Sequence, residues 1–581
     1  MDERLYINSK LIHLPERSVS RTLQINDFRE TKDRQANYSN SIKIPKTASN
    51  VEIFESLGMV GIQNRLPYEK VSVKYVLNGI QLISDGKGII KNTNEFYNLV
   101  VYDGNISMND LLGVQTLQDL DFNLGAYRYN HTLTSFLFFN SFENTSGYVY
   151  CLKGLGGITS LQNTIPSFYI HTLFEMIFVQ KGWQIVGDIF SNADYLSRIQ
   201  TMDIGFENTV VGSIVNISGY PLTVNENENG DVNLEINRTT LNVTTNGLHS
   251  ISLTGTITVN AGDVTVRIKK NGTIVREFAV IGGGQTFTIS QSINAISGDT
   301  IEITEFAQAF PIHYNYHADY SISIKRDGRG FVINFNDIIG NTKQIDFVKD
   351  VMQRFNLSFR KVQNENKLEF ITSEEILNDI NNSEDWSNLF SRKLDESYKS
   401  NYAQDNQALY RYDEDSEDYA DGSLFVNDLN LPLEKTIFTS IYKASKYTSG
   451  VTYDINYWKD DEPQQDGLRI FKKEMTGIIS LNFRFLNTDQ SSNIKIDCAR
   501  LNFDGLEFQN EFDTYYPTFK KFLDDYKIIV IEVNLDVIDI YNLNFFKLKY
   551  IKQLGRYFYL NKIINFRTGQ PTKIEIIEAP L

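Results

Sequence analysis

Apolar and polar residues alternate through much of the first ~150 residues, with the two-residue period of half-buried strands. Val71–Val76 shows this alternation most clearly. Asn78-Gly79 is a strong signal for a tight hairpin turn, and Gly86-Lys87-Gly88 is typical of another turn. We therefore predict that this part of the chain consists of short strands joined by turns.

The period changes to that of a helix after Pro166. Ser167 is a candidate N-cap, Gly182 a candidate helix end, and Trp183–Val186 a strand. The apolar stripe between them is Ile170, Leu173, Phe174 and Ile177. A second stripe, Ile345, Val348, Val351, Met352 and Phe355, precedes a predicted hairpin of Leu357–Val362 and Lys367–Ile371. The two units predict one α+β domain in two parts, residues 161–237 and 308–385.

The segment that separates these parts, residues 238–307, is rich in Thr, Val, Ile and Gly. Turn signals recur in it about every 10 residues, as in small all-β domains. They are Asn246-Gly247, Ala261-Gly262, Asn271-Gly272, Gly282–Gly284 and Ser297-Gly298. We expect an inserted β-sandwich or jelly roll, entered through the polar linker Asn225–Asp231.

Residues 386–440 are polar and acidic. Positions 401–440 hold nine acidic side chains and two basic ones, which predicts a long exposed arm or loop. Residues 441–581 are again rich in strand-forming residues, with one amphipathic segment around Tyr516–Phe522. The expected fold class is mainly β with α+β parts.

Composition agrees with this fold class, because 38 Phe and 32 Tyr suit pleated, half-buried surfaces. The formal net charge is −16 and no basic stretch is present, which argues against a nucleic-acid-binding protein. Only two cysteines occur, Cys151 and Cys498, so we expect a chain that folds in a reducing cytoplasm without a disulfide framework. We expect neither a signal peptide nor a membrane span, because no apolar run approaches ~20 residues.

Candidate catalytic and metal-binding motifs are few. His313 and His317 lie four residues apart, with Asn315 between them and Asp319 nearby, but zinc sites need more protein ligands. Asp413–Asp421 lacks the glycine and the closing glutamate of a calcium loop, so a solvated acidic loop is the favoured interpretation.

Other catalytic signals are equally weak. The glycine-rich 154–157 segment has no following Lys-Ser/Thr to bind phosphate, and we interpret it as a turn. The 72 acidic residues contain no distinguishable pair for glycoside hydrolysis, and no nucleophile elbow is present. We therefore expect no enzyme, and no catalytic, cofactor-binding or metal-binding residues.

The predicted sandwich could bind sugar if aromatic side chains formed a stacking platform. Residues 238–307 contain no Trp or Tyr, so a structural decoration is the favoured interpretation and sugar binding the alternative.

Two terminal segments carry a family resemblance. Leu23–Ile44 (LQINDFRETKDRQANYSNSIKI), followed by Pro45-Lys46-Thr47 and Asn50, resembles a signature of the tail hub or baseplate hub family of Bacteroides-type phages, including crAss-like phages. Ile551–Glu578 is similar to the closing hairpin of these proteins, and Phe168–Phe190 to their helix-then-strand element. The sandwich and the acidic arm have no counterpart in that pattern.

This resemblance implies two β-barrel-like domains related to the tail-tube fold, over residues 1–160 and 441–581. It also implies a closed ring of copies, with a trimer favoured over a hexamer. Such a hub would join the tail tube or tail barrel to the distal spike, fibres or tip, with other tail proteins above and below. DNA would pass through only as cargo. The virion tail, assembled in the host bacterial cytoplasm, is the expected location.

Two other functions remain open. One is a distal tail or ring adaptor protein. The other is a carbohydrate-binding or receptor-binding tail protein that uses the inserted sandwich.

Overall fold

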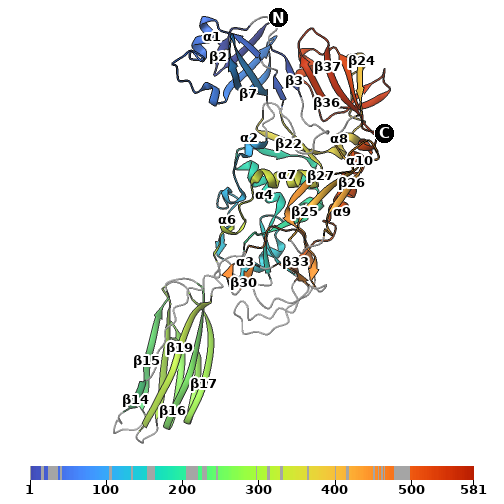
Figure 1. The fold of residues 1–581 in the computed structure, drawn as a ribbon. Coiled ribbons are helices and arrows are strands. Elements are labelled where there is room, and N and C mark those ends of the chain that lie inside the picture. Colours follow the sequence, from blue (N-terminus) through green and yellow to red (C-terminus); the bar gives the residue numbers. More distant parts are fainter. Residues whose placement is uncertain are drawn as a thin grey trace.

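The protein is an elongated, mostly β molecule (Figure 1). The computed structural model describes residues 2–14, 19–23, 37–39, 42–103, 108–132, 135–153, 164–204, 220–224, 232–243, 247–295, 298–309, 314–327, 332–362, 365–398, 401–413, 418–448, 452–455, 457–459, 462–463, 465–476 and 497–580. Two β lobes lie at one end, a mixed body in the middle, and a separate strand domain at the other end. The predicted fold class, mainly β with α+β parts, is confirmed.

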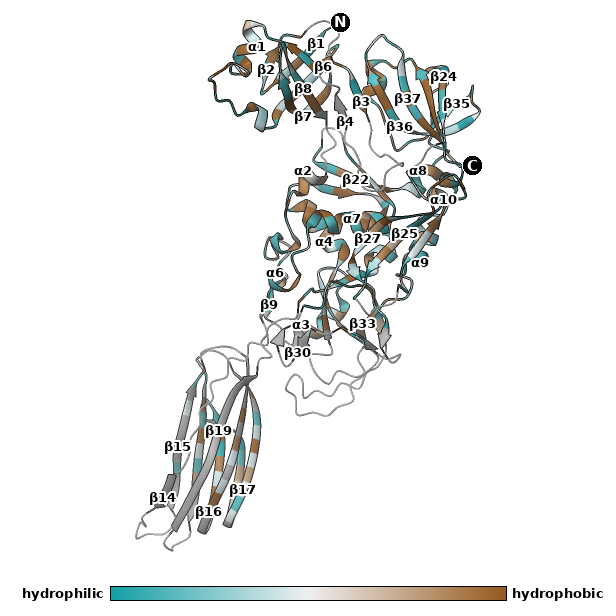
Figure 2. Ribbon diagram, in the orientation of Figure 1, coloured by the Kyte–Doolittle hydropathy of each residue, from teal (hydrophilic) through white to brown (hydrophobic). Residues whose placement is uncertain are grey.

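The two lobes belong to one 14-stranded sheet. The N lobe contains β1 (Glu3–Ile7), β2 (Lys10–Ile12), β5 (Ile42–Pro45), β6 (Val71–Leu77), β7 (Ile80–Thr93) and β8 (Phe96–Asp103). The C lobe contains β23 (Glu384–Asp385), β24 (Phe390–Ser397), β34 (Ile528–Val533), β35 (Lys549–Ile551), β36 (Arg556–Phe566) and β37 (Thr572–Glu578). Apolar and polar segments alternate along these strands, as expected where one face of a sheet is buried (Figure 2).

The local pattern of the N lobe is confirmed in part. Val71–Val76 lies in β6, and Asn78 and Gly79 form the turn with φ values of 50° and 81°. The predicted turn at Gly86-Lys87-Gly88 is wrong, because β7 continues through it. A Cβ on Gly88 would lie 2.8 Å from side-chain carbons of Val71 and Val73. These glycines therefore allow close packing inside the lobe and do not reverse the chain.

The body contains both predicted helices. They are α4 (Ile170–Val179) and α7 (Gln344–Arg354), beside a sheet of β12 (Gln184–Val186), β22 (Lys367–Thr372) and β21 (Leu357–Lys361). Parallel pairing of β12 with β22 brings the two sequence segments together. The predicted N-cap is wrong: Ser167 lies in a strand that runs directly into α4, and Tyr169 occupies the cap position.

A closed five-stranded barrel lies in the body and not in the lobes. Its strands are β10 (Tyr148–Leu152), β11 (Thr164–Tyr169), β13 (Arg198–Thr201), β32 (Ile470–Thr476) and β33 (Cys498–Asn502). Residues 441–581 are consequently divided between this barrel, the rest of the body and the C lobe, which differs from the single C-terminal barrel that the resemblance implies. The reason is pairing between distant segments of the sequence, since β13 pairs with β32 and places Arg198 opposite Lys472.

The acidic arm expected at 386–440 is wrong. This region forms β24 of the C lobe and a three-stranded sheet of β25 (Asp405–Arg411), β26 (Gly422–Phe425) and β27 (Glu434–Lys443). In β25, Asn406, Ala408 and Tyr410 are buried, whereas the residues between them face outward. Asp405, the first residue of β25, thus takes a partly exposed position of an ordinary half-buried strand pattern.

The inserted domain is larger than residues 238–307. Its six strands are β14 (Tyr220–Val224), β15 (Val232–Asn242), β16 (Gly247–Lys270), β17 (Thr273–Ala295), β18 (Thr300–Ala309) and β19 (Tyr314–Asp327). The first half of β16 pairs with β19 and the second half with β18, so the long β16–β17 hairpin spans the whole domain.

Two of the turn signals predicted in this domain lie within strands and do not form turns. Ala261-Gly262 lies inside β16 and Gly282–Gly284 inside β17, where the pairing register shifts between Val259 and Asp263. The signals there mark an irregularity of the long hairpin and not its end. Asn271-Gly272 does form a turn. The predicted linker at 225–231 lies outside the described residues.

Candidate functional site

The junction between the two lobes brings together strands from opposite ends of the sequence. It is a hairpin of β3 (Arg21–Leu23) and β4 (Asn37–Ser39). β4 pairs with β8 of the N lobe, and β3 pairs with β36 of the C lobe. The described parts of the two resemblance segments therefore meet in one sheet; residues 24–36 and 40–41 lie outside the described chain.

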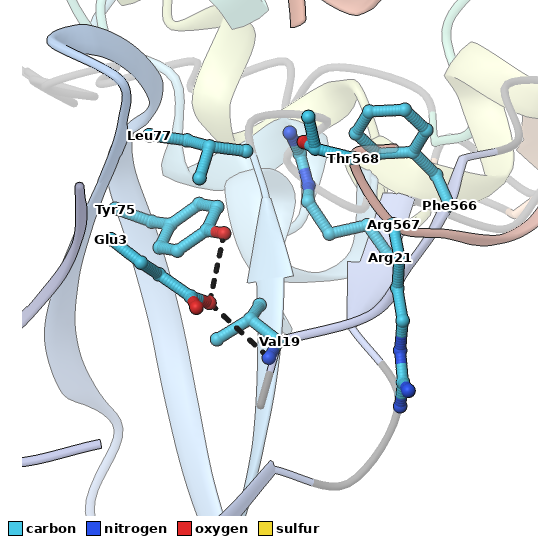
Figure 3. Close-up of a pocket in the computed structure, with 8 residues that line it drawn as sticks. All are labelled: Glu3, Val19, Arg21, Tyr75, Leu77, Phe566, Arg567 and Thr568. Carbon is cyan, nitrogen blue, oxygen red and sulfur yellow. Dashed lines mark hydrogen bonds between the residues drawn. The ribbon is translucent and has the colours of Figure 1, made fainter. Parts of the chain in front are cut away.

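A small cavity of about 20 Å³, lined by both polar and apolar side chains, lies beside this junction (Figure 3). Its lining residues are Glu3, Val19, Arg21, Tyr75, Leu77, Phe566, Arg567 and Thr568. The Glu3 carboxylate accepts hydrogen bonds from the Tyr75 hydroxyl at 3.1 Å and from the Val19 amide at 3.3 Å. Burial, reinforced by the adjacent Glu3 carboxylate, raises the pKa of Tyr75. A cavity of this size has room for about one water molecule, so it suits a structural joint better than a substrate site.

The side chains of the β3–β36 pair strengthen the joint. Thr22 Oγ1 donates to Asn565 Oδ1 at 3.4 Å, and Thr22 is 2% exposed. Arg21, the neighbouring residue of β3, is only 4% exposed. The lobes are therefore coupled by a buried backbone ladder together with side-chain contacts.

The same sheet ends in β2 on the N-lobe side and β24 on the C-lobe side. In β24, residues 391–395 are all exposed, and the pairing with β34 is irregular at two places. Arg392, which pairs with Glu532 at 2.6 Å, and Lys393 place charges along this edge. Charged, bulged edges discourage indiscriminate strand pairing, yet they leave a surface that a specific neighbour can cover.

A network of buried charges holds the body together. Glu511, on α9 (Phe508–Tyr515), lies between two arginines: Arg198 Nη1 is 2.5 Å from Oε1, and Arg354 Nη1 is 3.0 Å from Oε2. Arg354 Nε also contacts Asp350 Oδ1 at 2.6 Å, and Arg198 Nη2 contacts Asp194 Oδ2 at 2.7 Å. The side chains of both arginines and of Glu511 are 1% exposed. The network links the barrel to α7 and α9.

Hydrogen bonds complete this network. Ser440 Oγ on β27 donates to Asp350 Oδ2 at 2.6 Å and accepts from Arg354 Nη2 at 2.7 Å. Burial opposes ionisation of Asp194, but Arg198 and the hydrogen bonds from Tyr515 and Lys472 outweigh it and lower the pKa of that carboxyl. Because the central side chains have almost no solvent access, we assign the network a structural role.

The motifs considered from sequence do not converge on a site. His313 lies outside the described residues, and His317 and Asp319 are placed only by the backbone of β19. Asp413 pairs with Lys443 at 2.7 Å, while Asp421 accepts a hydrogen bond from the Tyr410 amide, so these two carboxylates have different partners. The 154–157 and 414–417 segments lie outside the described chain.

Two features are absent from the part of the chain that the structure describes. They contain no group of three or more His, Cys, Asp or Glu side chains placed to hold a metal ion. No helix in this part of the chain is long and apolar enough to cross a membrane.

The sequence did not reveal the Arg198–Glu511–Arg354 network. Its partial signal was the Asp350–Arg354 pair, four residues apart on the predicted second helix, which places both side chains on one helix face.

The partly buried His171 on α4 should make the stability of the body depend on pH. Burial lowers the pKa of His171 on α4 to about 4, against an ordinary value of 6.5. A lowered histidine pKa means that the folded state resists protonation, so the contribution of His171 to the free energy of unfolding is fully present above pH 6.5. This free energy falls by about 3 kcal/mol as pH drops from 6.5 to 4, and it levels off below pH 4. Denaturation curves over this range should therefore show a loss that His171→Gln reduces; an unchanged slope in H171Q would contradict the assignment.

No family model matches the chain, and no curated protein matches it. Similar solved structures include the 43 kDa tail protein of prophage MuSo2 from Shewanella oneidensis, with 6% identity, 100% of this chain and 98% of that chain covered, and a TM-score of 0.33.

Partial likenesses involve other classes of protein. The infectious bursal disease virus Gx strain structure matches at 13% identity over 21% of this chain and 35% of that chain, with a TM-score of 0.16. A family 35 carbohydrate binding module from Clostridium thermocellum matches at 19% identity over 20% of this chain and 97% of that chain, with a TM-score of 0.13. This chain thus spans about a third of the viral chain. At these TM-scores a likeness does not establish a common fold.

Proposed function

We propose that this chain is a structural component of a bacteriophage tail and forms its tail hub or baseplate hub. The observation that carries the proposal is the junction of the lobes. The two terminal segments that resemble the hub family are far apart in sequence, yet Leu23 of the first pairs with Ile563 of the second, through β3 and β36. The resemblance implies two β-barrel-like domains in one subunit of a ring, and we assign the two joined lobes to that role.

The arrangement of the lobes favours ring formation. They lie side by side at one end of the molecule, and the sheet is open at β2 and β24 (Figure 1). A ring needs two different surfaces on each copy, so that every copy contacts the next in the same way. Three copies would present six lobes to a hexameric tube, with other tail proteins above and below.

Charge is consistent with a channel for DNA. The net charge of −16 would let a lumen lined by carboxylates pass DNA without binding it. In this proposal DNA is cargo and the chain has no catalytic activity, cofactor or metal.

A second role concerns the inserted strand domain. It projects from the body at the end opposite the lobes (Figure 1). This position leaves it free to contact a receptor or a surface glycan, which would make the chain a receptor-binding tail protein. A distal tail or ring adaptor is the nearest alternative to a hub.

Fractionated phage particles test the proposal. Mass spectrometry of tails separated from heads should find this chain with the tails, while the capsid protein serves as the control for the heads. A chain found only in infected-cell lysate, and in neither fraction, would reject a structural role. A chain found only in heads would reject a tail role.

A further inference from the structure

The inserted domain has two outer faces that differ in chemistry. Phe278 and Phe287 lie nine positions apart in β17, which is about 30 Å along a straight strand, yet their ring centroids are 5.4 Å apart. The β16–β17 hairpin therefore bends between these residues, where its register shifts, and closes over itself. One half of the hairpin pairs with β19, which pairs with β14, and the other half pairs with β18, which pairs with β15. We call these two parts the β19 sheet and the β18 sheet.

The outer face of the β18 sheet is charged. In β16 its outward positions include Arg267 and Lys269, which alternate with buried valine and isoleucine. Arg267 lies 3.4 Å from Glu277, and Lys269 pairs with Glu235. Because these charges neutralise one another, this face needs no charged ligand.

The outer face of the β19 sheet carries hydroxyl groups instead. Its exposed hydroxyl side chains in β16 and β17 alternate with buried apolar ones, and they are Thr254, Thr256, Thr258, Thr286, Thr288 and Ser290. Thr256 lies opposite Thr286, with the two Oγ1 atoms 3.2 Å apart. In the next row Thr258 lies opposite Gly284, where a Cβ would be 3.3 Å from Thr258 Oγ1. The glycine thus leaves the space above the Thr258 hydroxyl open.

Strand β19 continues this face. Its backbone pairing places Asp319 beside Thr256, with His317 in the next row. Lys325 lies farther along the same strand, so the positions that pair with residues 250–258 bring one acidic and one basic residue to the face. The rows of hydroxyls in β16 and β17 add no charge. The face is therefore neutral overall, in contrast to the outer face of the β18 sheet.

A neutral face of hydroxyl groups fits an uncharged glycan. A hydroxyl can donate one hydrogen bond and accept others, so rows of threonine and serine can match rows of sugar hydroxyls. A polyanion would need a basic surface, and the centre of a protein interface would be apolar and aromatic. The outward positions of the described strands of this sheet provide neither. Without an aromatic platform one copy binds weakly, and several copies in one ring would strengthen the binding together.

We infer that the outer face of the β19 sheet binds a neutral cell-surface polysaccharide. The inserted domain projects from the body at the end opposite the lobes, so it can reach a cell surface while the lobes contact the tube (Figure 1). The inference rests on the receptor-binding role in the proposed function, and it names the surface and the class of ligand for that role.

Binding of the purified full-length chain to immobilised polysaccharides tests this surface. The panel holds neutral glucans, mannans and galactans beside the polyanions heparin and alginate. A triple variant with Thr256→Val, Thr286→Val and Thr288→Val removes three hydroxyls and keeps β-branched side chains at exposed strand positions. It should bind the neutral polysaccharide at least about tenfold more weakly than the wild type, because several hydrogen bonds are lost.

The control variant carries Thr265→Val and Thr273→Val in the half of the hairpin that belongs to the β18 sheet. It should bind as the wild type does, and both variants should unfold thermally as the wild type does. Binding that the triple variant retains, or binding to the polyanions alone, would overturn the inference. Loss of the triple variant from purified tails would also overturn it, since the face would then be an assembly contact.

Two further outcomes separate this inference from the hub proposal. A wild-type chain that is present in tails but binds no polysaccharide of the panel overturns the inference and leaves the hub proposal standing. A chain that binds a neutral polysaccharide through this face but is absent from tails overturns the hub proposal and leaves the binding surface standing.

Discussion

Replacing Glu511 with glutamine should lower the free energy of unfolding of the body by about 3–5 kcal/mol. The substitution keeps the shape of the side chain but leaves Arg198 and Arg354, each 1% exposed, without the carboxylate between them. A buried cation without its counter-charge has little access to water, so the folded state bears the cost. Urea denaturation followed by tyrosine fluorescence and circular dichroism would measure the change.

The matched control is Asp513→Asn on the same helix. Asp513 is exposed, and its carboxylate accepts a hydrogen bond from Gln509 at 3.2 Å. Removing its charge should therefore change stability by no more than about 0.5 kcal/mol. If E511Q and D513N had equal stability, the network would not hold the body together.

Replacing Thr22 with proline should separate the two lobes. Thr22 lies in β3, which is paired on both sides, and a proline there removes a backbone donor and costs about 3 kcal/mol or more. Amide hydrogen exchange should accelerate in β3, in β4 and along the β3-facing part of β36. We also expect the variant chain to be lost from purified tails.

Thr22→Val is the control for this variant. Valine retains the backbone N–H and removes only the hydroxyl that donates to Asn565 at 3.4 Å. T22V should therefore keep the lobes joined and enter tails. A T22P chain with wild-type exchange in β36 and normal incorporation would contradict the importance of the joint.

Local features of this fold could be predicted because local periodicity produces them. The alternation in β6 and the apolar stripes of α4 and α7 each reflect one buried face, which is visible within a short window of sequence. Gly86 and Gly88 were misinterpreted because their role depends on Val71, Val73 and other neighbours across the sheet. The region 386–440 was misinterpreted as an arm for a similar reason, since its charge count concealed the alternating buried positions of β25.

The candidate site could be predicted only in outline. The terminal segments were identified as important by resemblance, but the joint beside them depends on contacts such as that of Thr22 with Asn565, 543 positions apart. Arg198 and Glu511 are 313 positions apart and reveal no motif in the sequence. Their contact depends on how the barrel, α7 and α9 pack, which no local pattern specifies.

The most direct test of the hub proposal is a cryo-electron microscopy reconstruction of the tail from intact phage particles. The account predicts a single closed ring of this chain at the distal end of the tube, with three copies, both lobes of each copy facing the tube, and the inserted domain pointing away from it. Twelve copies at the head-proximal end, or a location only on peripheral fibres, would contradict it.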